Sequence, residues 1–365
     1  MFSKIPVVYA VGTDYQIFFA VRRSAYAWIK IGDRVFDDTV CGNMRSMPGM
    51  RHITVPQAVL DAAGGYTLCL QRIRERKSYW TQTLGTQETR YRFFPVPASG
   101  AARCYMVGDA HGDADRTLAA AKAYGDFDFL IVNGDMNESV NTSRFELAHN
   151  VAAELCRGER PVVYARGNHE NRGAATELLP QYIPLRNGRT YYTFRLGGLW
   201  GIVLDCGEDK EDDHPEYGGY ARFHAYRQEE TAYLRRVLRQ KAHEFDAPGV
   251  TRRIVVVHTQ FPRRQDPEFD TERSLYQTWC DLLEKMRVDV MLTAHMHSYQ
   301  VLRPGDPDLR LQISCPLVIG TANNRNQIGG TGCTFGPDGV TIQFTTSDGT
   351  VFPPETLWPP LRTKI

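Results

Sequence analysis

Residues 102–112 read ARCYMVGDAHG, and residues 127–138 read FDFLIVNGDMNE. In each stretch a short apolar run of strand-forming residues leads directly into a turn that carries glycine and aspartate. Three later stretches repeat this order: PVVYARGNHE at 161–170, RRIVVVHTQ at 252–260 and VMLTAHMH at 290–297. Strands that end in polar clusters predict an open α/β sheet, because such sheets bind ligands where the loops at the carboxyl ends of their strands converge.

Helical segments separate these strands. We predict helices at 113–125, at 143–157 with Ser143 as N-cap, at 226–245 and at 274–287. A strand hairpin is predicted at 191–205 around two glycines, and further strands at 311–320 and 339–346. This alternation predicts an α/β domain with a mixed sheet over residues 99–365.

Residues 1–98 follow a different pattern. Seven short runs rich in Val, Ile, Tyr and Phe are separated by glycine and polar turns, and a helix is considered only at 55–63. This spacing predicts a small fibronectin- or immunoglobulin-like β-sandwich as an accessory domain. Residues 95–101, PVPASGA, are predicted to link it to the α/β domain.

The composition argues against a nucleic-acid or membrane partner. Lys and Arg total 43 against 42 for Asp and Glu, so the chain has no excess of positive charge. Residues 1–24 show no signal peptide of the usual form, and their apolar run is too short to cross a bilayer. The eight cysteines include no Cys-x-x-Cys pair, and we interpret them as buried thiols. We expect a cytoplasmic protein, with a secreted source as the alternative.

The polar residues at the five strand ends are of the types that hold a pair of transition-metal ions. They are Asp109, His111, Asp135, Asn168, His258, His295 and His297. Carboxylate, carboxamide and imidazole groups without thiolate suit Mn, Fe or Zn. Two such ions about 3.5–4 Å apart can clamp a phosphoryl group and activate a bridging water. Asp135 is the natural candidate to bridge them, because a carboxylate has two oxygens.

Each of these residues also has an ordinary structural interpretation. An aspartate before glycine is often only a turn residue, and His258 alone would fit a core histidine. The five clusters together favour the metal interpretation, because their order along the chain brings every candidate to the same edge of the predicted sheet.

The motifs GDAHG, GDMNE, GNHE, VVVHTQ and AHMH, over about residues 103–300, resemble those of the calcineurin-like metallophosphoesterases, in the family's order. The resemblance implies a four-layer sandwich of two mixed sheets flanked by helices. It implies that His169 is the general acid that assists the leaving oxygen. It also implies one ion held by Asp109, His111 and His297, a second held by Asn168, His258 and His295, and Asp135 as the bridge.

The sequence departs from the family's pattern at two positions. Ala294 stands where the family usually has glycine. Glu138 stands where purple acid phosphatases, which this chain resembles in domain order, have a metal-binding tyrosine. Protein phosphatases have an aspartate there that orients the catalytic histidine, so Glu138 either orients His169 or is an exposed loop residue. Arg166 either contacts phosphate or pairs with a carboxylate behind its loop.

We therefore predict a two-metal hydrolase that cleaves a phosphate monoester or diester through a metal-bridging hydroxide. The expected substrate is a phosphorylated small molecule or a phosphoprotein, and the oligomeric state stays open. A phosphodiesterase or nuclease is the nearest alternative, although a nuclease is expected to carry a basic groove. A binding protein with a vestigial catalytic domain is the alternative from another class, and the complete ligand set argues against it.

Overall fold

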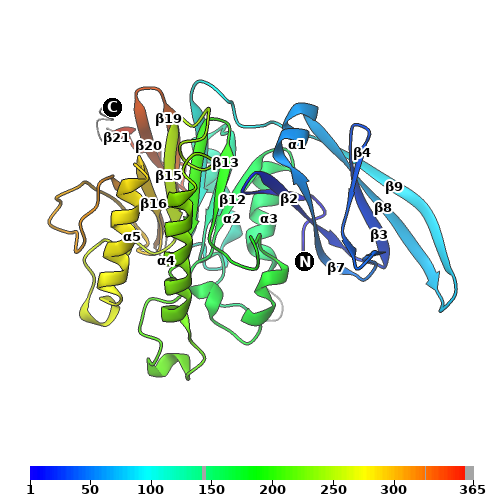
Figure 1. Cartoon of the computed structure of the whole chain (residues 1–365), viewed down its shortest axis with the longest axis horizontal. Helices are drawn as coiled ribbons and strands as arrows, with labels where there is room; N and C mark the ends of the chain where they lie inside the picture. Colours follow the sequence, from blue (N-terminus) through cyan, green and yellow to red (C-terminus); the bar gives the residue numbers. More distant parts are fainter. Residues whose placement is uncertain (142–144, 325, 358–365) are drawn as a thin grey trace.

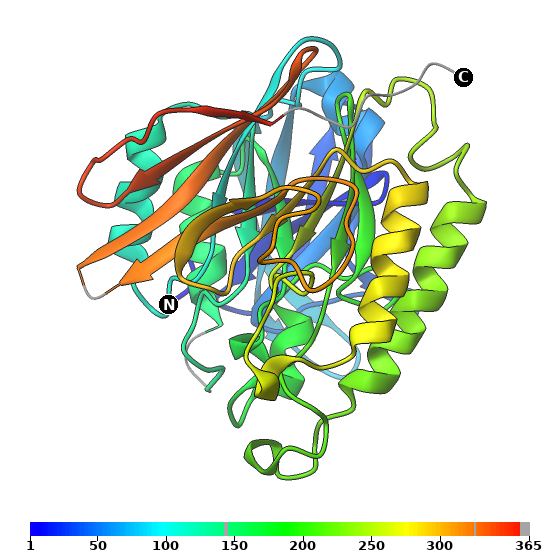
Figure 2. The ribbon, with the colours of Figure 1, turned by 90° about the vertical axis from the view of Figure 1, so that its left-hand side faces the viewer.

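The computed structural model describes residues 1–141, 145–324 and 326–357. Within them, a 15-stranded network runs in the order β13-β14-β15-β16-β18-β19-β10-β11-β12-β1-β2-β7, with β17, β20 and β21 attached at its side (Figure 1). The network divides into two half-sheets that meet where β18 pairs with β19. Helices lie outside the strands on both sides, with α4 and α5 together on one side (Figure 2).

The first half-sheet has β10, β11, β12 and β1 as its parallel centre. Its strands are β10 (Ala102–Val107), β11 (Phe129–Asn133), β12 (Pro161–Ala165), β1 (Val7–Val11), β2 (Asp14–Val21), β7 (Gly49–Pro56), β19 (Gln327–Gly336), β20 (Gly339–Thr346) and β21 (Glu355–Leu357). Met106 is opposite Ile131, and Ile131 is opposite Val163. This register places the carboxyl ends of β10, β11 and β12 side by side.

The second half-sheet has the parallel order β14-β15-β16-β18. Its strands are β13 (Tyr192–Leu196), β14 (Leu199–Leu204), β15 (Arg252–Val257), β16 (Val290–Thr293), β17 (Ser298–Leu302) and β18 (Leu317–Asn324). The two outer strands, β13 and β17, pair antiparallel to their neighbours. The carboxyl ends of β15 and β16 therefore lie at one edge, as do those of the first half-sheet.

Two apolar cores explain why these strands are almost uniformly hydrophobic. In β15, Ile254 and Val256 belong to the core shared with the first half-sheet, whereas Val255 and Val257 belong to a second core with α4 and α5. Alternate side chains of a strand point to opposite faces, so a strand covered on both faces is apolar throughout. The predicted α/β architecture of two mixed sheets between helices is confirmed.

The predicted helices form, although the helix predicted at 226–245 starts at Phe223 and already ends at Arg239. They are α2 (Ala114–Tyr124), α3 (Glu146–Cys156), α4 (Phe223–Arg239) and α5 (Arg273–Lys285), with short 3-10 turns η1 (His169–Asn171), η2 (Thr176–Gln181), η3 (Pro215–Tyr217) and η4 (Pro267–Phe269). Asp113 caps α2 by accepting from Arg116 N. The predicted N-cap Ser143 lies outside the described residues. In the described part of the chain, every helix is too short or too polar to cross a membrane.

The N-terminal segment forms strands in two layers beside the α/β part (Figure 1). One layer, β1-β2-β7, continues the first half-sheet through the parallel pairing of β1 with β12. The other is a separate sheet of β4 (Arg34–Asp37), β3 (Ala25–Ile31), β8 (Gly65–Arg76) and β9 (Thr81–Arg92). Beside them are α1 (Gln57–Ala63), β5 (Thr39–Val40) and β6 (Asn43–Met44). That residues 1–98 are a domain of their own stays a prediction, since their first layer is hydrogen-bonded into the main network.

Tyr192 links the two half-sheets. This fully buried side chain of β13 donates its hydroxyl to Tyr164 O of β12 at 2.7 Å and lies 3.3 Å from Tyr164 N. We expect Tyr192→Phe to lower the free energy of unfolding by about 1–3 kcal/mol, because a buried carbonyl loses its partner. Chemical denaturation measures the change. Tyr79→Phe is the control, since Tyr79 is fully exposed, and an equal effect of both substitutions would contradict the assignment.

Candidate metal centre

Loops that follow five parallel strands bring the predicted ligands together. Asp109 and His111 follow β10, Asp135 follows β11 and Asn168 follows β12, while His258 follows β15 and the pair His295 and His297 follows β16. Three overlapping groups have ligand atoms within 4.8 Å of one another. The groups are Asp109, His111 and His297; His111, Asp135 and His169; and Asp135, His258 and His295. Six of the seven predicted ligands thus fall into these groups, and Asn168 lies beside the third.

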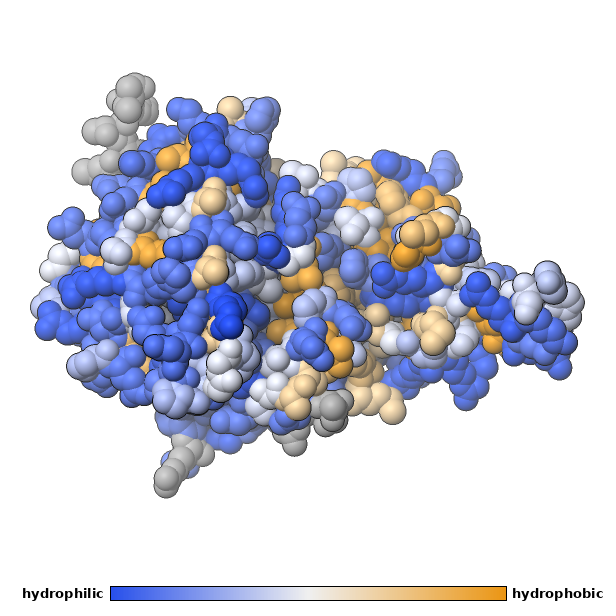
Figure 3. Space-filling model, turned by 60° about the horizontal axis from the view of Figure 1, so that its bottom comes forward, coloured by the Kyte–Doolittle hydropathy of each residue, from blue (hydrophilic) through white to orange (hydrophobic). Residues whose placement is uncertain are grey.

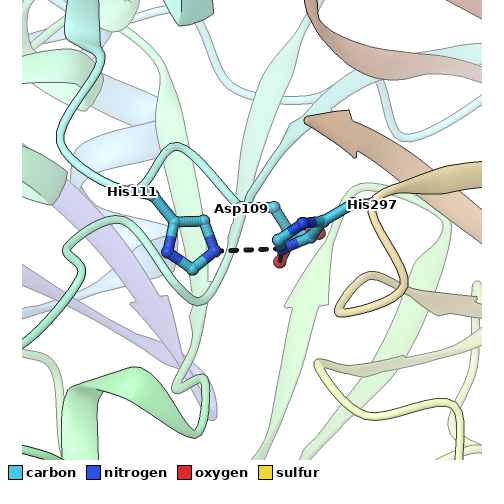
Figure 4. Close-up of side chains that lie close together, drawn as sticks. All are labelled: Asp109, His111 and His297. Atoms are coloured by element: carbon cyan, nitrogen blue, oxygen red, sulfur yellow. Dashed lines mark hydrogen bonds and ion pairs between the residues drawn. The ribbon is translucent and has the colours of Figure 1, made fainter. Parts of the chain in front are cut away.

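In the first group, ligand atoms of His111, His297 and Asp109 face each other (Figure 4). His111 Nε2 lies 3.0 Å from His297 Nε2, and His297 Nε2 lies 3.6 Å from Asp109 Oδ1. Asp109 Oδ1 is buried and has no hydrogen-bond partner among the described residues. Burial lowers the pKa of both histidines, which favours the neutral imidazole that binds metal. An unpaired buried oxygen beside two converging ring nitrogens fits a bound cation.

The third group is centred on Asp135. His258 Nε2 lies 3.0 Å from Asp135 Oδ2, and His258 Nδ1 donates to Asn133 O at 2.7 Å. Burial disfavours the charged form of His258, but the Asp135 and Asp109 carboxylates outweigh it and raise the pKa of His258 to about 10. Burial raises the pKa of Asp109 to about 7.

Asn168 directs its side-chain oxygen into the same group. The oxygen lies 3.0 Å from His295 Nδ1, 3.3 Å from His258 Nε2 and 3.2 Å from Asp135 Oδ2. Its amide nitrogen faces Arg172 Nη2 at 3.0 Å, so that donor meets donor. Hydrogen bonding alone favours the opposite orientation of the amide. In either orientation the Asn168 carboxamide lies within hydrogen-bond distance of Asp135, His258 and His295, so it can turn its oxygen to this group as a ligand.

The loops hold these side chains by unusual backbone conformations. Five of the candidates have positive φ angles, which are rare for residues other than glycine. They are Asp109 (50°), His111 (44°), Asp135 (50°), His295 (72°) and His297 (50°). Such strain persists where the surroundings impose it and is common at functional sites. The alternation of side chains along a strand no longer applies after the turn, so His295 and His297 can both face the centre.

Glu170 ties the Asp135 loop to the Asn168 loop. Its buried carboxylate accepts from Asp135 N and Gly167 N at 2.8 Å each, and from Met136 N at 2.9 Å. Gly167 allows this close approach, since a Cβ there would lie 2.1 Å from Asp135 Oδ1 and 2.7 Å from Glu170 Oε2. Glu170 was not singled out from the sequence, although it is the last residue of the GNHE motif.

Residues of β18 orient Asp109. Thr321 donates its hydroxyl to Asp109 Oδ2, which also accepts from His295 N at 2.9 Å, and Asn323 Nδ2 donates to Asp109 O at 2.7 Å. One carboxylate oxygen is thereby fixed, and the other is left for a ligand bond. Thr321 and Asn323 carried no sequence signal, because they lie more than 200 residues after the aspartate they contact.

The contact expected between Glu138 and His169 involves a different atom. His169 Nδ1 donates to the backbone carbonyl of Glu138 at 2.7 Å. The Glu138 carboxylate instead accepts from His111 Nδ1 at 2.8 Å, and its side chain is 72% exposed. The prediction that the Glu138 side chain orients His169 is therefore wrong. Its carboxylate faces a candidate metal ligand because the loop turns it away from His169.

The arginines near the centre are paired with carboxylates. Arg166 Nε donates to Asp205 Oδ2 at 2.8 Å, which decides between its two sequence interpretations in favour of the carboxylate behind the loop. Arg172, which the sequence did not single out, lies 3.3 Å from His169 Nε2 and forms a two-pronged pair with Glu208 at 3.1 and 3.0 Å. The segment 204–217 thus reaches the centre, since its Asp209 also lies 3.9 Å from His295 Nε2.

A family model for calcineurin-like phosphoesterases matches residues 102–299. The chain belongs to the calcineurin-like phosphoesterase family. The match includes all five strand-end clusters, so the family resemblance seen in the motifs is confirmed. Membership identifies the chain with a family of phosphoric ester hydrolases that use divalent metal ions.

Two curated relatives are similar over part of their lengths. Purple acid phosphatase 21 of Arabidopsis thaliana is 22% identical over 191 residues, which cover 49% of this chain and 40% of that protein. A probable cyclic nucleotide phosphodiesterase of Fibrobacter succinogenes is 25% identical over 116 residues, which cover 28% of this chain and 44% of that protein. The chain spans less than half the length of either relative.

Solved structures share the fold at low identity. Purple acid phosphatase PPD1 from yellow lupin, Lupinus luteus, superposes with a TM-score of 0.61 and 12% identity, over 98% of this chain and 74% of that chain. PhoD superposes with a TM-score of 0.55 and 11% identity, over 97% and 89% respectively. These likenesses confirm the predicted metallophosphoesterase architecture.

We expect Glu170→Gln to lower the free energy of unfolding by about 1–3 kcal/mol, because the amide nitrogen must face a backbone N–H. Denaturant titration of the metal-free protein measures it. Glu154→Gln on the exposed face of α3 is the matched control. Equal stability of Glu170→Gln and the wild type would show that the three backbone contacts are dispensable.

Proposed function

We propose that this chain is a two-metal phosphoesterase that hydrolyses a phosphate monoester or diester. The observation that carries the proposal is the unpaired, buried Asp109 Oδ1 beside the converging nitrogens of His111 and His297. Family membership supports the reaction class. The complete set of ligand types argues against a vestigial site in a binding protein.

The first and third groups of donors support the division of ligands between two ions. We assign Asp109, His111 and His297 to one ion, and Asn168, His258 and His295 to the other, with Asp135 between them. Oxygen and nitrogen donors without thiolate suit Mn, Fe or Zn. When bound, such a pair lowers the pKa of water and neutralises charge on phosphoryl oxygens.

His169 is proposed as the proton donor to the leaving oxygen. Because Nδ1 is committed to the carbonyl of Glu138, Nε2 is the atom that can hold and deliver a proton. This atom lies 3.9 Å from Asp135 Oδ2 at the rim of the candidate centre, and it accepts from Arg172 Nη1 at 3.3 Å, a contact that must be released for Nε2 to carry the proton. Glu208 pairs with Arg172 through two hydrogen bonds and neutralises most of its positive charge. Arg172 is therefore proposed to position the His169 ring and not to bind the substrate.

Monoester and diester substrates each have one supporting relative. The similarity to purple acid phosphatase 21 favours a phosphatase, and the similarity to a probable cyclic nucleotide phosphodiesterase favours a diesterase. Purified protein supplied with Mn²⁺ and assayed on chromogenic monoesters and diesters distinguishes them. The phosphorylated small-molecule or phosphoprotein substrate and the cytoplasmic location stay predictions. The nuclease alternative is disfavoured by the paired arginines around the centre.

The bridging role of Asp135 makes a direct prediction. We expect Asp135→Asn to bind less than half the metal of the wild type and to lose measurable activity, because an amide has one ligand oxygen and no charge. Elemental analysis and the ester assay measure the two effects, and chelator should abolish wild-type activity. Asp126→Asn, on an exposed loop, is the control. Full metal content with retained turnover in Asp135→Asn would refute the bridge.

The role of His169 predicts a dependence on the leaving group. The variant His169→Ala should keep its metal, and its rate on an alkyl ester should fall by about 10²–10⁴-fold, which is the usual contribution of a positioned general acid. The loss should shrink for nitrophenyl esters, whose leaving oxygen needs little protonation. His243→Ala on the surface is the control. Depleted metal and an equal loss on all substrates would make His169 a loop-holding residue instead.

A further inference from the structure

A second concave site lies away from the candidate metal centre, between the loop before β13 and the C-terminal half of α4. We call it the arginine pocket, and its cavity measures about 510 Å³. Its main lining residues are Arg186, Arg189, Tyr191, Tyr233, Arg236 and Arg239. Helix α4 runs from Phe223 to Arg239, and Arg236 and Arg239 lie in its last turn.

Positive charge in the arginine pocket is largely unpaired. Glu229, the one acidic residue of the lining, lies 2.7 Å from Arg189 Nη2. Among the described residues, Arg186, Arg236 and Arg239 have no carboxylate within ion-pair distance. This contrasts with the candidate metal centre, where Arg166 and Arg172 are both neutralised. Several like charges around one cavity repel one another unless an anion joins them.

Aromatic rings and a glycine hold the guanidinium groups in place. The Arg236 guanidinium lies 5.0 Å from the centre of the Tyr233 ring, which in turn packs 5.1 Å from Tyr191. Arg186 lies against Gly12, where a Cβ would come within 1.4 Å of its guanidinium. Stacking and confinement already restrict the arginine side chains, so less conformational entropy is lost when a ligand binds. The pocket is therefore partly preorganised.

We propose that the arginine pocket binds a small polyanion that carries two or more phosphate groups. A guanidinium presents its N–H groups as a planar fork that matches two phosphate oxygens. The cavity falls within the range of about 300–1,000 Å³ that is typical of small-molecule sites. Its charges surround one cavity rather than a long track, which favours a compact ligand over a nucleic-acid strand. The site is independent of the proposed hydrolysis, since none of its residues is a candidate metal ligand.

Calorimetric titration of the Mn²⁺-loaded protein with inorganic triphosphate tests this site. The double variant Arg236→Gln/Arg239→Gln should lose one binding event or weaken it by about tenfold or more. Arg235→Gln is the matched control, because Arg235 is exposed on the same turn and lies outside the lining. Triphosphate bound at the metal centre would be unaffected by either change, so the difference between the variants isolates the pocket. The single variant Arg239→Gln, exposed and unpaired, is expected to show a smaller loss in the same direction.

Identical isotherms for the double variant and the wild type would overturn the proposal. Equal or tighter binding of citrate at the pocket would overturn the preference for phosphate. A single-stranded oligonucleotide that binds more tightly than triphosphate, and loses that affinity in the double variant, would overturn the compact ligand. In the wild type, higher salt should weaken triphosphate binding at the pocket, because the contact is electrostatic. The double variant should lack this salt-sensitive binding event.

Discussion

The structure depends on two buried carboxylates, Asp109 and Asp135, that lie together at the carboxyl edge of the strands. Both are almost fully buried, and His258 Nε2 lies 3.9 Å from the first and 3.0 Å from the second. Buried charge is stabilised only where opposite charge or directed hydrogen bonds surround it. The left-handed turns, the Glu170 contacts and the Thr321 hydroxyl all hold donor atoms towards these two groups. The proposed pair of cations would complete this arrangement.

The two half-sheets supply the rigid frame that such a site requires. Asn133 lies directly beneath it, and its side-chain nitrogen reaches Val257 O and Leu292 O of the other half-sheet at 3.3 and 3.4 Å. Tyr192 makes a second link between the halves. Because the ligands come from both halves, a small displacement of one against the other would separate the two groups of donors. The continuation of the sheet through β1 widens the first half without adding any of the candidate ligands.

Charge is distributed differently at the two sites. Around the candidate metal centre, Arg166 and Arg172 are each paired with a carboxylate, so in the proposed reaction the charge on a phosphoryl group would be neutralised mainly by metal. The arginine pocket has the opposite arrangement, with guanidinium groups that lack carboxylate partners in the described structure. With the bottom of the Figure 1 view turned forward, the left-hand part of the surface, on the side of α4 and α5, is mostly hydrophilic, whereas apolar residues gather near the middle and towards the N-terminal strands on the right (Figure 3).

The sequence by itself determined the features that are local along the chain. Apolar runs followed by polar turns predicted the parallel strands, and the order of the five clusters predicted which side chains meet, since parallel strands end at one edge. Only the tertiary structure decided which atoms touch. Glu138 approaches His169 with its carbonyl, and Thr321 holds Asp109 from more than 200 residues away. The paths of the loops and the register of β18 set these contacts, and neither leaves a periodic signal in the sequence. The joining of the N-terminal strands to β12 and the gathering of four arginines in one pocket likewise arise from packing between segments distant in the chain.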